Sequence, residues 1–103
     1  MSRIDKLEEL LRENPGDAFL NHALALEYVK LGEDAKAEII FRRILSTTPD
    51  YVGSYYHLGK LLERKGDEAG AVLVYKEGMA AAKKAEDNHA YGELRSACEY
   101  LEF

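Results

Sequence analysis

The sequence has one cysteine, two prolines and no tryptophan among its 103 residues. A lone cysteine excludes an intrachain disulfide, so packing has to hold the fold together. No apolar run approaches the roughly 20 residues that a membrane-spanning helix needs, and we therefore expect no membrane partner. The N-terminus is charged where a secretory signal would be apolar. These features together predict a cytoplasmic protein.

Charge of one sign is not concentrated in any region. Fourteen Lys and Arg residues stand against 19 Asp and Glu residues, which gives a net charge of -5. Proteins that bind nucleic acids usually carry a basic stripe that displaces counterions from the phosphates. The even distribution predicts that nucleic acid is not a partner. With 47% apolar and 32% charged residues, the composition is typical of a folded, soluble domain.

Candidate catalytic and metal-binding groups are few and scattered. The three histidines, His22, His57 and His89, lack the spacing that places two metal ligands on one helix face. Cys98 falls on an apolar stripe, where a buried thiol is the plainer interpretation. Paired carboxylates fall at predicted helix starts or on an outer helix face, where the helix dipole or solvent stabilises them. We predict that the protein is not an enzyme and has no cofactor or metal.

The chain does contain a repeat, because it matches itself at an offset of 34 residues. The identical pairs are Pro15 with Pro49, Leu24 with Leu58, Gly32 with Gly66, Ala35 with Ala69, and Ala37 with Ala71. Apolar residues follow helical spacing in both halves of each copy. This periodicity predicts helices over 18–31 and 34–47 in the first copy, and over 52–65 and 68–83 in the second.

Small residues indicate how the two helices of a copy would meet. Gly32 and Gly66 directly follow the first helix of each copy, where a chain reversal favours a residue that accepts a positive φ angle. Ala37 lies one helical turn before Phe41. A small residue beside a large one lets two helices approach closely while the ring fills the gap. Pro49 disfavours a helical conformation in the residue before it and is predicted to end the first copy.

These features resemble the tetratricopeptide repeat. The family's first-helix spacing appears as Tyr55-x-x-Leu58-Gly59-x-x-Leu62 and, in weaker form, as Asn21-x-x-Leu24-Ala25-x-x-Tyr28. The second-helix positions match as Ala37 with Phe41 and as Ala71 with Tyr75. The resemblance implies an all-α fold, an antiparallel helix-hairpin solenoid of about six helices. It also implies a concave groove, lined by the first helices, that binds an extended peptide or a partner helix.

We predict a single domain over residues 1–103, in which two full repeats stand between two half-units. Its parts are an N-terminal half-unit helix over 2–13, repeats over 16–49 and 50–83, and a C-terminal capping helix over 87–102. In the capping helix, Leu94 fits a first-helix position only after a shift of about three residues. Terminal units with a polar outer face are what a short repeat array needs at its ends.

The resemblance places the partner-binding groove on the first helices of the repeats. Its candidate residues are Phe19, His22, Leu26, Val29, Lys30, Tyr56, His57, Lys60, Glu63 and Arg64. The last helix would add His89, Ser96, Glu99 and Tyr100. The mixture of aromatic, apolar and charged side chains suits an amphipathic partner segment. An alternative interpretation is that Phe19, Leu26 and Val29 simply pack against the N-terminal helix.

Two functional hypotheses follow from these patterns. The leading one is a protein–protein interaction scaffold that binds a protein or peptide partner in the groove. The alternative is a homodimerising structural module that uses its C-terminal helix. This helix ends in three large apolar residues, Tyr100, Leu101 and Phe103, with no following helix to cover them.

Overall fold

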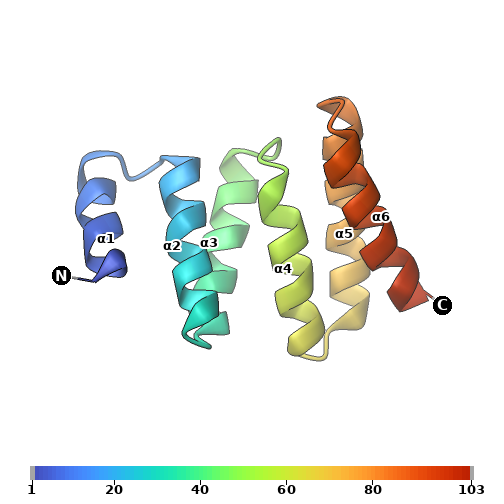
Figure 1. Cartoon of the computed structure of the whole chain (residues 1–103), viewed down its shortest axis with the longest axis horizontal. Helices are drawn as coiled ribbons and strands as arrows, with labels where there is room; N and C mark the ends of the chain where they lie inside the picture. Colours follow the sequence, from blue (N-terminus) through green and yellow to red (C-terminus); the bar gives the residue numbers. More distant parts are fainter. Residues whose placement is uncertain (1, 103) are drawn as a thin grey trace. The chain divides into compact units, whose positions relative to one another are not determined.

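The computed structural model describes residues 2–102, which form six α-helices and no strand over that range (Figure 1). The helices are α1 (Arg3–Glu13), α2 (Ala18–Lys30), α3 (Asp34–Thr47), α4 (Gly53–Arg64), α5 (Glu68–Lys84) and α6 (Asn88–Glu102). The predicted all-α, helix-hairpin fold is confirmed. No described helix combines the length and the apolar character required to cross a membrane.

The helices group into two compact units, one ending at Thr48 with α1 to α3 and the other beginning at Pro49 with α4 to α6. In the first unit, α2 and α3 form a hairpin and α1 packs against α2. Ala37 and Phe41 of α3 are both fully buried. The small residue and the ring thus lie in the core of the hairpin, as their spacing predicts.

The second unit repeats this hairpin with α4 and α5, and α6 packs mainly against α5. Its core contains the fully buried ring of Tyr75. A Cβ atom added at Gly59 of α4 would overlap that ring. One added at Gly78 of α5 would lie 2.6 Å from the Cβ atom of Tyr55 and 3.1 Å from Leu94 of α6. Glycine at these two positions therefore lets α4, α5 and α6 approach closely.

The turns after α2, α4 and α5 have the same hydrogen bonds. In each turn, two backbone amides bond back into the last turn of the preceding helix. The residues with positive φ are Gly32 at 76°, Gly66 at 88° and Glu86 at 57°. The two glycines confirm the sequence prediction, whereas the third turn holds the same conformation without glycine.

Aspartate side chains begin α2, α5 and α6. Each accepts a hydrogen bond from a backbone amide three residues later. The bonds join Leu20 to Asp17 at 2.9 Å, Gly70 to Asp67 at 2.9 Å, and Ala90 to Asp87 at 3.0 Å. Because an equivalent aspartate precedes both α2 and α6, the residues of the two helices can be matched by counting from Asp17 and from Asp87.

Candidate protein-binding hollow

A hollow of about 750 Å³ lies within the second unit, between α4 and α6. Its lining residues are Tyr56, Lys60, Asn88, His89, Gly92, Glu93, Ser96, Ala97 and Tyr100. Residues three or four apart on a helix share a face, so these side chains form one stripe on α4 and a second on α6. The structure therefore brings together Tyr56 and Lys60 with three of the residues expected on the last helix.

The Tyr56 side of the hollow is held by several contacts. Tyr56 is half-buried, and its ring centroid lies 6.5 Å from that of Tyr75 and 5.7 Å from that of His57. The ammonium group of Lys60 lies 5.5 Å from the centre of the Tyr56 ring and 3.5 Å from the Glu63 carboxylate. These contacts fix an aromatic surface with a positive charge beside it.

The α6 side of the hollow is more exposed. Tyr100 has 79% of its surface exposed. His89 Nε2 lies 3.9 Å from the Glu93 carboxylate, and both side chains are open to solvent. A Cβ atom at Gly92 would meet no atom within 4 Å. Gly92 thus leaves free space on this side, between side chains that can adapt to a bound group.

Glu63 takes part in the packing of α4 against α5. Its carboxylate accepts a hydrogen bond from the hydroxyl group of the buried Tyr75. Burial raises the pKa of Tyr75, and the hydrogen bond to Glu63 raises it further. The described structure therefore gives Glu63 a structural partner in addition to Lys60. A part for Glu63 in binding stays a prediction.

His57 and Arg64, the other α4 candidates, lie outside the lining of the hollow. His57 is half-buried, and burial lowers its pKa, with a smaller opposing effect from Glu93. Arg64 is exposed near the end of α4. Glu99, expected on the groove side of α6, instead lies 3.6 Å from Arg95.

Five candidates lie on α2, in the first unit. Phe19 is 68% exposed, and the ring of His22 packs edge-on against Phe41 at 5.6 Å. Leu26 and Val29 are half-buried. Lys30 lies 3.1 Å from the Glu27 carboxylate. Their participation in a groove with α4 stays a prediction.

Four lining residues were not predicted from the sequence: Asn88, Gly92, Glu93 and Ala97. Helical spacing from His89 could have found Gly92 and Glu93, which lie three and four residues further along the same helix. Asn88 and Ala97 carry no comparable signal. Of the three self-association residues, Tyr100 is exposed and Leu101 is half-buried, while Phe103 lies outside the described residues.

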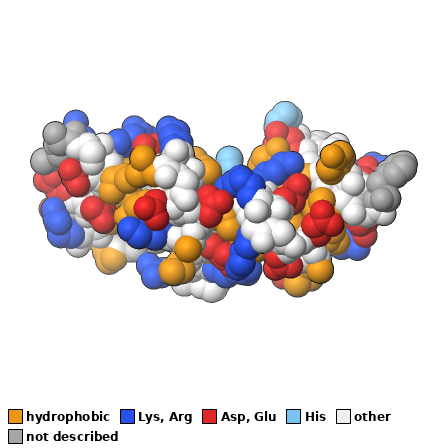
Figure 2. Space-filling view, turned by 90° about the horizontal axis from the view of Figure 1, so that it is seen from below, with side chains coloured by type: hydrophobic (Ala, Val, Ile, Leu, Met, Phe, Trp, Pro, Cys, Tyr) orange, Lys and Arg blue, Asp and Glu red, His pale blue; other side chains and the backbone are white. Residues whose placement is uncertain are grey.

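Charged and apolar side chains are interspersed over the face drawn in Figure 2. Among the residues that the structure describes, no three His, Cys, Asp or Glu side chains form a group that could hold a metal ion. Cys98 is buried, its thiol lies 3.4 Å from the Glu102 carboxylate, and burial raises its pKa. The hollow itself is lined by aromatic, charged and hydroxyl side chains, which offer apolar contact and hydrogen bonding.

Comparison with known proteins identifies the repeat. Residues 20–51 and 52–84 each match the family model described as tetratricopeptide repeat. The TPR repeat-containing protein PA0015 of Pseudomonas aeruginosa is 30% identical over 88% of this chain and 87% of its own length. The expected family resemblance is confirmed by both matches.

Solved structures agree with this assignment. The crystal structure of a tetratricopeptide repeat domain protein from Salinibacter ruber has a TM-score of 0.81 and 37% identity, covering 84% of this chain and 96% of that one. The solution structure of protein BPP2914 from Bordetella parapertussis has a TM-score of 0.85 and 27% identity, covering 99% of this chain and 89% of that one. Domains of this type generally act as non-catalytic scaffolds for protein–protein interactions. The chain belongs to the tetratricopeptide repeat family.

Proposed function

We propose that this chain is a protein–protein interaction module that holds a short segment of a partner protein in the hollow between α4 and α6. The observation that carries the proposal is the pairing of two stripes, one with Tyr56 and Lys60 and one with His89 and Tyr100, around open space. Tyrosines supply much contact area with few rotatable bonds, which is why they are common binding anchors.

The size and chemistry of the hollow support a peptide segment as the ligand. Its volume of about 750 Å³ admits a few side chains of a partner. The fixed Tyr56 surface would lose little conformational entropy when an apolar side chain packs on it. Lys60, Glu93 and Ser96 then offer a positive charge, a negative charge and a hydroxyl group to the polar side of the same segment.

We extend the binding surface to α2 by the repeat. At the offset of 34 residues, His22 corresponds to Tyr56 and Leu26 to Lys60. Phe19, Val29 and Lys30 belong to the same helix as these two residues. By this correspondence we propose that these five residues also contact a partner.

A displayed library of random peptides tests the proposal whichever protein is the natural partner. Peptides selected on the wild-type protein are measured against Gly92→Leu, which fills the hollow at a position where a Cβ atom has free space. The matched control is Gly16→Leu, because a Cβ atom at Gly16 also meets nothing within 4 Å and Gly16 does not line the hollow. Thermal melting verifies that both variants fold.

We expect Gly92→Leu to lose at least about tenfold in affinity, which corresponds to about 1.4 kcal/mol. Gly16→Leu should bind like the wild type. Replacing both Tyr56 and Tyr100 with Ala should weaken the same peptides. Peptides that bind Gly92→Leu as tightly as the wild type would show that the hollow is not the binding site.

Homodimerisation through α6 is the competing hypothesis, favoured by the 79% exposure of Tyr100. It predicts that sedimentation velocity gives a dimer for the wild type and a monomer for Tyr100→Ser. A wild-type protein that is monomeric at every concentration would eliminate this hypothesis.

A further inference from the structure

The last helix has the residue pattern of a first hairpin helix. Counted from the equivalent aspartates that begin α2 and α6, the buried Leu24 and Leu94 occupy the same position, with exposures of 7% and 1%. The residue that follows is Ala25 in α2, whereas it is Arg95 in α6. No second helix of its own follows α6 within the described residues.

A complete hairpin has no room for a side chain as large as arginine at this position. Ala25 is completely buried. Gly59 is the equivalent residue of α4, and even a Cβ atom there would overlap the ring of Tyr75. Arg95, in contrast, is 59% exposed and lies 3.6 Å from Glu99. Arg95 therefore occupies the place that the second helix of a hairpin would cover.

The first helix has the complementary pattern, that of a second hairpin helix. The residue that ends α1, Asn14, has φ -133° and ψ 68°, and the one that ends α3, Thr48, has φ -134° and ψ 69°. This shared ending fixes the register of the two helices. In that register Arg3 stands where α3 has Ala37 and α5 has Ala71, both completely buried.

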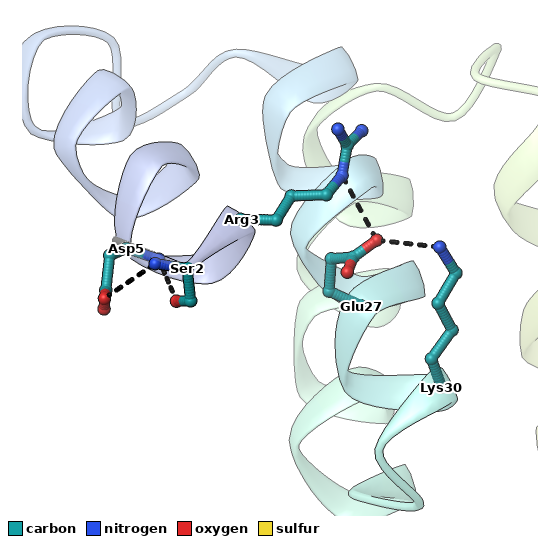
Figure 3. Close-up of polar contacts among 5 residues, drawn as sticks. All are labelled: Ser2, Arg3, Asp5, Glu27 and Lys30. Carbon is teal, nitrogen blue, oxygen red and sulfur yellow. Dashed lines mark hydrogen bonds and ion pairs between the residues drawn. The ribbon is translucent and has the colours of Figure 1, made fainter.

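Arg3 extends into solvent and across to the neighbouring helix. Its side chain is 67% exposed, and its Nε atom lies 3.2 Å from the carboxylate of Glu27 in α2. Figure 3 shows this contact, together with Lys30 on the same carboxylate and the capping hydrogen bonds between Ser2 and Asp5 that begin α1. The α1 and α6 helices thus each have an arginine at a position where the complete hairpins have a buried small residue.

We propose that Arg3 and Arg95 prevent copies of this chain from joining head to tail. The α6 helix of one copy and the α1 helix of a second copy are the two halves of one hairpin. Their union would cover Leu10, which is 52% exposed although its equivalent Ile44 is only 4% exposed. Burial of this apolar surface would favour the contact.

The two arginines oppose that union in two ways. Neither side chain fits where the complete hairpins hold alanine or glycine. The union would also bring two positive charges into one dry interface, where desolvation and like-charge repulsion are both unfavourable. Such a head-to-tail contact does not close on itself and would otherwise produce open chains of molecules.

Single variants give the sharpest test of the proposal. Arg3→Ala alone and Arg95→Ala alone should each keep the wild-type mass, because one arginine still occupies any joint. A mixture of the two variants should form a one-to-one complex, since only α6 of Arg95→Ala and α1 of Arg3→Ala can join. Sedimentation velocity up to about millimolar concentration would detect a weak complex.

The double variant Arg3→Ala/Arg95→Ala should grow in mass with concentration to at least twice the wild-type value. Adding Leu10→Asp should restore the wild-type mass. The control Arg12→Ala/Arg42→Ala removes the same charge from exposed sites on α1 and α3 and should behave like the wild type. Circular dichroism verifies helix content in every sample.

Several results would overturn the proposal. These are a mixture of single variants with no complex, a double variant with the wild-type mass, or a wild type that itself forms growing chains. An increase in mass of the Arg12→Ala/Arg42→Ala control would contradict it equally. So would an increase in mass of the double variant that Leu10→Asp does not reverse. If the double variant failed to fold, the mixture of single variants would still decide the matter.

Discussion

Two glycines of the second unit occupy opposite environments. Gly59 in α4 is buried directly against the Tyr75 ring, whereas Gly92 in α6 faces the open hollow. The same residue type is therefore required for packing at one position and leaves space at the other. Substitutions at the two positions separate these effects, because both replace a helical glycine.

Gly59→Ala should destabilise the protein by about 1–3 kcal/mol, since its Cβ atom would force the Tyr75 ring out of place. Gly92→Ala should stabilise it by up to about 1 kcal/mol, because alanine favours the helix and meets no neighbour. Urea denaturation measures both changes. Equal stability of the two variants would contradict the packing described for Gly59.

His57 should make the stability of the protein depend on pH. Burial lowers its pKa in the folded state below the ordinary value of 6.5, so the unfolded chain binds a proton first as the pH falls. The contribution of His57 to stability should therefore be fully present above this value and be lost as the pH falls below it. Denaturation of His57→Gln at a series of pH values should show a smaller decrease. An unchanged profile for His57→Gln would refute this prediction.

At the scale of elements, the turns decide where each hairpin reverses. Gly32 and Gly66 adopt positive φ after α2 and α4, and Glu86 adopts the same conformation after α5. A residue with a side chain is strained in this region of the φ, ψ map, whereas glycine is not. The turn before α6 is thus the least favourable of the three.

Glu86→Gly should raise the stability of the protein by about 1 kcal/mol. The reverse change at the equivalent turn, Gly66→Glu, should lower it by a similar amount. Midpoints of thermal unfolding would show a rise for the first and a fall for the second. A lower midpoint for Glu86→Gly would mean that its side chain contributes more than the strain costs.

At the scale of the whole molecule, the helices form two compact units, and the hollow belongs to the second. Each repeat of such a protein is stabilised mainly by its own contacts and those with its neighbours. A single substitution should therefore change local stability most in the unit that contains it. Hydrogen exchange can measure this for each helix.

In Gly59→Ala, backbone amides of α4, α5 and α6 should exchange faster than in the wild type. Amides of α1, α2 and α3 should change much less, because the contacts of Gly59 lie within the second unit. Hydrogen exchange followed by mass spectrometry of peptides provides the measurement. Equal acceleration in all six helices would show that the two units open together.

The sequence by itself determined the repeat, the helices and the family. Helical periodicity, Gly32 and Gly66 act over a few residues of chain, so their effects can be read without knowing the fold. The resemblance to the tetratricopeptide repeat placed Tyr56 and Lys60 among the groove residues of α4.

Only the tertiary structure decided which helices face each other across the hollow and which side chains have other partners. It placed Gly92 and Glu93 opposite Tyr56, and engaged Glu63 with the buried Tyr75. It also fixed the register in which Arg95 replaces a buried small residue. These outcomes depend on packing between segments distant in the chain, which local patterns of residues do not specify.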